Sequence, residues 1–433
     1  MNMTTLYHWE GGGEVDSTGI NNVYNEVWGY AQNNREYAII GTTEGTHFLD
    51  ITEITEAYEA DFIPGRQQGS TVVHRDYHNY NNYLFMVCQQ GESSLQIADL
   101  SYLPDSVHLV YDSEEILRVA HNIFIDTTQA VLYTVIANRD GIDADIRMQR
   151  IDISNPATPQ LIEEFPTGVY IHDLYVNDGL ALLNRGNTDM AIFDYNTTPA
   201  QFLGSIDNYP GQGYNHSGYP NPEGTIYAMA DETFGSPIKI LDISDPSDIE
   251  VLATVSSGVN DLSVPHNQII HENKVYSSYY FDGVYVWSII DPENPILLGF
   301  YDTSSVPNQG SSLEGAWGVY PFLPSGRLLV SDIQTGLWVF ELDETLGASS
   351  VDKVEPLRLW PNPAESFIQI DNSSFQNGAQ YTVFEISGKI VLSGTLATQS
   401  NMRIRTDGIE NGLYLISLQD KNGIRSAKFV VQN

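Results

Sequence analysis

Cysteine, basic side chains and long apolar runs are all scarce in this sequence. The single cysteine, Cys88, cannot form a disulfide within the chain and has no second thiolate for a metal site. It is therefore expected to be a small buried apolar residue. No run of 18 or more apolar residues occurs, so no transmembrane segment is predicted. Residues 1–9 lack the basic and apolar segments of a secretion signal, which indicates a cytoplasmic chain or a chain given without its signal.

The 19 basic residues stand against 56 acidic ones. Binding to a nucleic-acid backbone needs Lys and Arg to displace counterions, so nucleic acid is not an expected partner. The imbalance is also uneven along the chain. Residues 357–433 hold 7 basic and 6 acidic residues, which leaves 12 and 50 for the first 356. This shift in composition predicts a domain boundary near Pro356.

Turn-forming and aromatic residues are plentiful, because the chain has 35 Gly and 20 Pro and is 11% aromatic. This composition favours many short strands. One apolar element that mostly ends in an acidic residue recurs seven times, usually followed by a turn rich in Pro, Asp and Asn and then another apolar run. The copies are THFLDIT at residues 46–52, LQIADL at 95–100, MQRIDIS at 148–154, MAIFDYN at 190–196, IKILDIS at 238–244, VYVWSII at 284–290 and LWVFEL at 337–342.

A further strand precedes each copy and carries a short polar or aromatic pair. Aligning the units places seven residues at one position: Trp28, Arg75, His121, His172, His216, His266 and Trp317. Their spacings are 47, 46, 51, 44, 50 and 51 residues. Four strands per unit, seven units and no helical periodicity predict an all-β, seven-bladed β-propeller. The apolar segment at residues 6–9 is expected to supply the outer strand of the last blade, which would remove an open sheet edge.

The ordered series resembles the LVIVD-repeat propellers found in bacterial proteins labelled choice-of-anchor B. The resemblance covers about residues 6–345. It rests on the repeated strand with its DPENP-type turn at residues 291–295, on VWGY at 27–30, on the His-Asn, His-Asp and His-Ser pairs, and on GAWGVYPF at 315–322. We take residues 1–345 as the propeller and residues 346–356 as a linker.

Residues 357–433 resemble a type A sorting domain of the type IX secretion system. The matching segments are LWPNPA at 359–364, YTVFEISGKIV at 381–391, GLYLIS at 412–417 and KFVV at 428–431. Alternating strands between Gly and Asn turns predict a small β-sandwich. The resemblance implies that the secretion machinery of a Bacteroidetes-type bacterium is a partner of this segment. It also implies a secreted or outer-membrane surface protein, and an N-terminal export signal that this chain does not contain.

The aligned residues are expected to converge, because the first strand of each propeller blade lines the central channel. We therefore predict a ligand-binding ring of Trp28, Arg75, His121, His172, His216, His266 and Trp317. The four histidines could instead bind a divalent metal such as Zn, Mn, Fe or Ca, or act as acids and bases. Asp76, Asp173, Asn122 and Asn267 could orient them.

A structural role is the competing interpretation of the same pairs. His-Asp and His-Asn pairs also satisfy backbone groups between blades, and neighbouring residues on a strand face opposite ways. On that rule, His172 and Asp173 do not both point into the channel. His74 and His78 are expected at the surface or at blade junctions. Residues 140–145 (DGIDAD) could hold Ca²⁺, but they lack the closing Glu of a calcium loop, which favours a solvated loop.

Three functions remain open from the sequence. The first is binding of an unknown extracellular ligand or partner at the channel mouth. The second is a metal-dependent hydrolase or lyase that uses the channel histidines. The third is a scaffold or adhesin whose outer loops carry the function. No nucleophile motif and no phosphate-binding loop favours a particular reaction.

Overall fold

The computed structural model describes residues 2–15, 17, 21–137, 146–165, 168–304, 313–343, 359–371, 380–385, 390–395, 401–420 and 423–432. The chain divides into two compact units, Met1–Gly347 and Ala348–Asn433. The predicted linker at residues 346–356 and the acidic loop at 140–145 lie outside the described residues. In the part that is described, no helix has the length and apolar character needed to cross a membrane.

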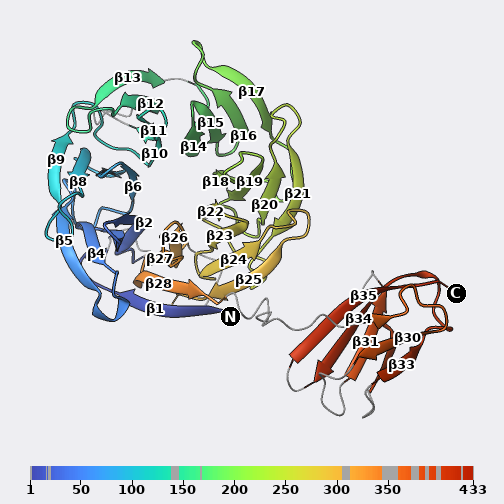
Figure 1. The fold of residues 1–433 in the computed structure, drawn as a ribbon. Helices are drawn as coiled ribbons and strands as arrows, with labels where there is room; N and C mark the ends of the chain where they lie inside the picture. Colours follow the sequence, from blue (N-terminus) through green and yellow to red (C-terminus); the bar gives the residue numbers. More distant parts are fainter. Residues whose placement is uncertain are drawn as a thin grey trace. The chain divides into compact units, whose positions relative to one another are not determined.

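The first unit is a ring of four-stranded antiparallel sheets, seven of them in the described residues (Figure 1). This is the all-β propeller expected from the repeats. From the innermost strand outward, the sheets are β2 (Tyr24–Gln32), β3 (Arg35–Thr42), β4 (Gly45–Asp50), β5 (Tyr58–Pro64); β6 (Arg75–Tyr80), β7 (Tyr83–Cys88), β8 (Leu95–Asp99), β9 (His108–Ser113); β10 (Asn122–Asp126), β11 (Val131–Ala137), β12 (Ile146–Asp152), β13 (Gln160–Phe165); β14 (Asp173–Asn177), β15 (Leu180–Asn184), β16 (Met190–Asp194), β17 (Gln201–Ile206); β18 (Asn215–Pro220), β19 (Ile226–Asp231), β20 (Ile238–Asp242), β21 (Glu250–Val255); β22 (Gln268–His271), β23 (Lys274–Ser278), β24 (Val284–Ser288), β25 (Ile296–Tyr301); and β26 (Ala316–Tyr320), β27 (Leu328–Asp332), β28 (Gly336–Leu342), β1 (Met3–Trp9).

The two ends of the first unit meet in one sheet. Strand β1 pairs with β28 antiparallel, from Met3 opposite Leu342 to Trp9 opposite Leu337, and so forms the outer strand of the last blade. The ring is closed by hydrogen bonds between the first and last strands of the unit. A short 3₁₀ helix, η1 (Ile54–Glu56), precedes β5.

The acidic residue of the repeated motif ends the third strand of a blade and starts its turn. Asp152 and Asp242 each accept a hydrogen bond from the backbone N–H two residues later, at 2.8 and 2.9 Å. Asp50, Asp99 and Asp194 do the same. Such Asx turns fix the reversal into the fourth strand. The repeat is therefore recognisable in the sequence because each blade needs this side chain at the same place.

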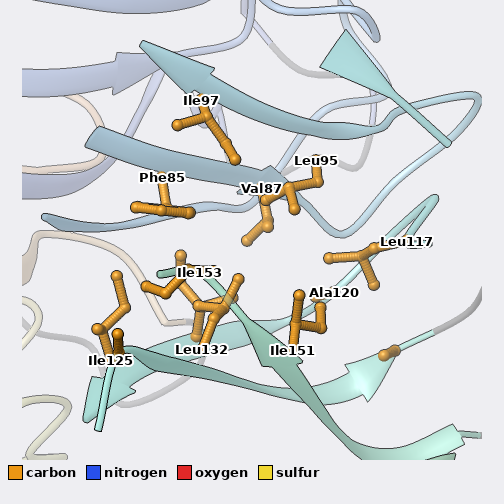
Figure 2. Packing of buried hydrophobic residues seen from close by; sticks show 13 residues of the cluster. Phe85, Val87, Leu95, Ile97, Leu117, Ala120, Ile125, Leu132, Ile151 and Ile153 are labelled. Atoms are coloured by element: carbon orange, nitrogen blue, oxygen red, sulfur yellow. The ribbon is translucent and has the colours of Figure 1, made fainter. Parts of the chain in front are cut away.

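The apolar core lies between neighbouring blades. In one cluster, Phe85 and Leu95 of the second blade pack against Leu132 and Ile151 of the third (Figure 2). All four are fully buried. Equivalent clusters lie at other blade junctions, so each sheet buries both faces and the inner strands are held firmly at the channel.

The second unit is a small sandwich of two sheets. One has the order β29 (Leu359–Trp360), β30 (Phe367–Asp371), β33 (Asn401–Arg405), and the other the order β32 (Ile390–Thr395), β31 (Gln380–Glu385), β34 (Gly412–Asp420), β35 (Gly423–Val431). Ile368 and Ile404 of the first sheet share a buried cluster with Ile416 and Phe429 of the second. This agrees with the expected β-sandwich.

Candidate binding site in the central channel

The innermost strands place three layers of side chains along the channel. The first layer comes from residues at the start of these strands or just before them, the second from the next residue, and the third from two residues further on. The second and third layers share one face of each strand because side chains alternate. Most blades therefore contribute side chains to the three layers in the same order along the channel.

The first layer is a closed ring of five imidazoles and one indole. Ring centroids are 4.2 Å apart for His74 and His121, 4.5 Å for His121 and His172, and 4.2 Å for His172 and His216. The circuit continues through His266 at 4.5 Å and Trp317 at 4.2 Å, and returns to His74 at 5.6 Å. Four predicted histidines and Trp317 are thus brought together.

Two predicted members of the ring lie elsewhere. The guanidinium of Arg75 turns away from the axis and donates to the carbonyl oxygens of Thr42, at 2.7 Å, and Gln67, at 2.6 Å. It joins two blades, and the imidazole of the preceding residue, His74, takes the place in the ring. His74 is not a surface residue, since it lies buried at the channel, but it does join two blades, because its Nε2 lies 2.7 Å from the His121 carbonyl oxygen of the next blade.

Trp28 does not belong to the ring. The alignment from the sequence placed the first blade three residues away from its true register. The pairing of β2 with β3 is irregular between Tyr24 and Val27, and that of β26 with β27 is irregular between Ala316 and Val319. The counterpart of Trp317 is consequently Asn25, and Trp28 lies in the third layer.

Both members of the pair at 172–173 face the channel, contrary to expectation. His172 belongs to the imidazole ring, and Asp173 lines a cavity on the channel axis. Alternation applies within a strand, but β14 begins at Asp173, so His172 precedes the regular strand and is free to turn inward.

The imidazole ring is electrically neutral at neutral pH. Burial lowers the pKa of His74 and of His172 to about 4. Desolvation, together with neighbouring imidazoles, lowers the pKa values of His121, His216 and His266 well below the ordinary range. Ring nitrogens also lie against backbone carbonyls of the next blade, as His172 Nδ1 does at 2.9 Å from the His216 oxygen and His266 Nδ1 at 2.6 Å from the Trp317 oxygen. Part of the ring's role is therefore to connect blades.

The second layer is rich in carboxyl groups. Its members are Glu26, Asp76, Asn122, Asp173, Ser217, Asn267 and Gly318. A Cβ added at Gly318 would lie 1.8 Å from Glu26 Oε1, so the glycine makes room for that carboxyl. Asp76 accepts from the N–H of Tyr77 and, in the next blade, from that of Ile123, at 2.8 and 2.7 Å.

These carboxyl groups hold their protons more tightly than usual. Desolvation raises the pKa of Asp76 to about 7 and that of Asp173 to about 8. The pKa of Glu26 rises well above its ordinary value through burial and the nearby charge of Asp76. None of the described residues lining the cavity beside them is Lys or Arg. The layer would therefore be strongly stabilised by a cation.

The third layer is an aromatic collar around the mouth of the channel. Its members, in order around the axis, are Trp28, His78, Phe124, Tyr175, Tyr219, Phe322 and Tyr320. Successive ring centroids lie between 4.7 and 5.8 Å apart, and Tyr320 closes the circuit on Trp28 at 5.0 Å. The cavity between collar and carboxyl layer has a volume of about 90 Å³. His78 belongs to this collar and not to the outer surface.

Glu232 is a functional candidate that the sequence did not reveal. It directly follows β19 and approaches the imidazole ring, with Oε2 3.9 Å from His216 Nε2. Gln89 directly follows β7 and contacts His121 Nδ1 at 2.9 Å. The end of the second strand of a blade is thus a second source of polar groups for the ring.

Two family models match parts of the chain. Residues 148–167 match the LVIVD repeat, and residues 358–432 match the secretion system C-terminal sorting domain. These matches confirm the LVIVD repeat and the sorting domain. The chain is accordingly handled by the type IX secretion machinery and is secreted or held at the outer-membrane surface. No curated protein matches the sequence.

Solved structures support the fold. The structure of U3-55K is similar with a TM-score of 0.55 and 9% identity, over 78% of this chain and 98% of that one. The β-propeller domain of Cps50 (Swd1) from Myceliophteria thermophila has a TM-score of 0.53 and 11% identity, over 78% and 98%. At such low identity these similarities establish the propeller fold alone.

Proposed function

We propose that this secreted β-propeller is a binding protein whose channel mouth takes up the cationic head of an extracellular ligand, an organic ammonium group. The observation that carries the proposal is the carboxyl layer of Glu26, Asp76 and Asp173 beneath a closed aromatic collar, with no Lys or Arg among the described residues that line the cavity. An ammonium group would supply the missing positive charge.

The collar suits such a group as well as the carboxyl layer does. A cation over aromatic faces gains roughly 0.5–2 kcal/mol, and more as water is excluded. Gln268 adds an acceptor, since its buried Oε1 has no hydrogen-bond partner among the described residues while its Nε2 donates to Ser217 Oγ at 3.0 Å. A buried acceptor without a donor costs about 1–3 kcal/mol, which a donating ligand would recover.

The size of the cavity restricts what enters. A volume of about 90 Å³ is well below the roughly 300–1,000 Å³ of pockets that enclose a whole drug-sized ligand. Only the head group would pass the collar, and the rest of the ligand would lie across the propeller face outside it.

Binding of n-butylammonium to the full chain, followed by calorimetry, is the test. We expect one site, with affinity that rises from pH 6 to pH 8.5 as Asp76 and Asp173 lose their protons, because their pKa values are about 7 and about 8. Asp173→Asn should weaken binding at least tenfold and Phe124→Leu several-fold. Asp207→Asn and Phe202→Leu, at exposed positions away from the cavity, are the matched controls.

Several results would contradict the proposal. Absence of saturable binding is one, and equal affinity in Asp173→Asn and in wild type at pH 8 is another. A parallel titration with CaCl₂ tests whether the site binds a hard metal cation and not an ammonium group. Tight Ca²⁺ binding that is indifferent to Phe124→Leu, with no ammonium binding, would identify a hard-cation site in place of the proposed one.

The alternative, a metal-dependent hydrolase or lyase with four histidine ligands, remains a prediction that the geometry favours less. Of the four, only His216 and His266 belong to the described group of ligand atoms that lie within 4.8 Å of one another.

A further inference from the structure

A second site lies on the imidazole ring, apart from the carboxyl layer and the collar. His216 Nε2, a nitrogen of His266 and a carboxylate oxygen of Glu232 form the one described group of three or more His, Cys, Asp or Glu ligand atoms that all lie within 4.8 Å of one another. None of these three residues lines the collar cavity. The site is therefore independent of the ammonium site proposed above.

The hydrogen bonding of His266 leaves one of its ring nitrogens with a free lone pair. His266 Nδ1 lies 2.6 Å from the carbonyl oxygen of Trp317 and must donate its proton there, which leaves Nε2 as an acceptor. This is the arrangement that fixes metal-binding histidines, in which one nitrogen donates to a carbonyl and the other is free for the metal. His216 Nε2 faces Glu232 Oε2 at 3.9 Å. A lone pair of His266 and the carboxylate of Glu232 are thus both available to a cation.

Tyr280 holds the carboxylate in place. Its hydroxyl donates to Glu232 Oε1, and its ring packs against His266 with centroids 4.9 Å apart. The backbone of Tyr280 has φ of +41°, in the left-handed region that non-glycine residues rarely adopt, and is fixed by two hydrogen bonds with Ala316 at 2.9 and 3.1 Å. Strain of this kind is commonly retained where it positions a functional side chain.

We propose that His216, His266 and Glu232 bind one divalent transition-metal ion of the Zn²⁺ or Fe²⁺ type. Two neutral imidazoles and one carboxylate are the ligands such ions prefer, whereas Ca²⁺ and Mg²⁺ prefer oxygen alone. Ligand atoms about 2.0–2.2 Å from a metal lie roughly 3–3.5 Å from one another, so the 3.9 Å separation needs to close by about 0.5 Å. Glu232 is partly exposed, with 18% of its side chain accessible, and gives the ion a way in.

The test uses the full chain freed of metal by a chelator and then titrated with ZnCl₂, or with CoCl₂ and visible absorption as the readout. We expect one ion per chain and a cobalt spectrum typical of mixed nitrogen and oxygen ligands. Glu232→Gln, which keeps an acceptor for Tyr280, should weaken binding at least tenfold, and His266→Gln should do the same. His108→Gln, at an exposed histidine stacked on Tyr102, is the matched control and should bind as wild type does.

Circular dichroism on every variant separates lost binding from lost folding. No stoichiometric ion in the wild type would overturn the proposal, as would undiminished binding in a folded Glu232→Gln. His121→Gln tests the four-histidine set directly, because His121 lies in the ring but outside the three-ligand group. If His121→Gln weakened metal binding as much as Glu232→Gln does, the three-ligand proposal would also be overturned.

Discussion

Between pH 6.5 and pH 4 the propeller is expected to lose stability steeply. Six imidazoles in the channel have pKa values far below the ordinary 6.5, so they stay neutral in the folded state while the unfolded chain takes up protons. They are His74, His78, His121, His172, His216 and His266. The unfolded state binds more protons in this window, so the free energy of unfolding falls as the pH falls.

The buried carboxyl groups act in the opposite sense. Glu26, Asp76 and Asp173 have raised pKa values in the folded state, so there the folded state binds more protons than the unfolded one and is favoured by acid. With six imidazoles and three carboxyl groups acting in opposite senses, the unfolded state binds about three more protons than the folded state. The free energy of unfolding therefore changes by about 4 kcal/mol per pH unit. A typical domain has only about 5–15 kcal/mol of stability in all.

Urea denaturation of the full chain at intervals from pH 7 to pH 4 measures this slope. The C-terminal unit is an internal control, because no histidine occurs after His271 in the sequence and the unfolding of that unit should lack the imidazole effect. His78→Phe should preserve the stacking on Trp28 and Phe124, and it should move the acid transition to lower pH. A propeller midpoint that stays constant from pH 6.5 to pH 5 would contradict the expectation.

Above pH 6.5 the imidazoles of the unfolded chain lose their remaining protons within about one pH unit, and the carboxyl groups dominate the pH dependence from there. Asp76 and Asp173, with pKa values of about 7 and about 8, lose protons in the folded state, so stability should fall from pH 6.5 to pH 8.5. Asp173→Asn should reduce this fall, since an amide has no proton to lose and can still accept from the Leu174 N–H. Thermal unfolding of both proteins at pH 6.5 and 8.5 provides the comparison, and an equal fall in both would contradict it.

The fold could be predicted from the sequence because each blade uses the same residue types at the same positions for the same structural purpose. Asp152 and Asp242 recur at one position since every blade needs an Asx turn there, and the inner-strand pairs recur because they face the same axis. The match of residues 148–167 to the LVIVD repeat reflects the same regularity.

The site was only partly accessible, because side-chain direction and local irregularities do not repeat. Arg75 occupies the right position in the sequence, but its long side chain reaches backbone carbonyls of another blade, and His74 fills the ring. Trp28 was misplaced because Trp28-Gly29 repeats the dipeptide Trp317-Gly318, whereas the strand pairing makes Asn25 the counterpart of Trp317. Glu232 approaches the ring from beyond the end of β19, where most other blades have no acid, so no periodic signal marked it.

Replacement of Asp231 by Ala is expected to destabilise the propeller by about 3–5 kcal/mol, because it would leave a buried charge unpaired. Lys239 Nζ donates to Asp231 Oδ2, and the side chains of both residues are inaccessible to solvent. Lys239 also donates to Ser236 Oγ at 2.7 Å and to the Gly211 carbonyl at 3.1 Å. Burial lowers the pKa of Lys239, against the opposing effect of Asp231.

Equilibrium urea denaturation of Asp231→Ala at pH 7 measures the loss in the free energy of unfolding directly. Glu163→Gln, which removes one partner of the half-exposed pair with Arg150 at 3.5 Å, is the matched control and should change stability by less than about 0.5 kcal/mol. The double variant Asp231→Asn with Lys239→Met removes both charges and should recover most of the loss, since an apolar replacement of a buried ion pair is commonly tolerated. A double variant no more stable than Asp231→Ala would show that the charge is not the cause.

This pair also connects the stability of the fold to the candidate metal site. Asp231 ends β19 and directly precedes Glu232, while its Oδ1 accepts from the Tyr209 hydroxyl and the Gly213 N–H, both at 3.0 Å. The loop that leads to His216 and the residue that precedes Glu232 are therefore anchored on one carboxylate. Asp231→Ala should weaken zinc binding along with the fold, whereas the double variant keeps a side-chain amide oxygen for both donors and should bind zinc as the wild type does. Zinc affinity that stays low in a stable double variant would mean that the charge itself, and not the anchoring, positions Glu232.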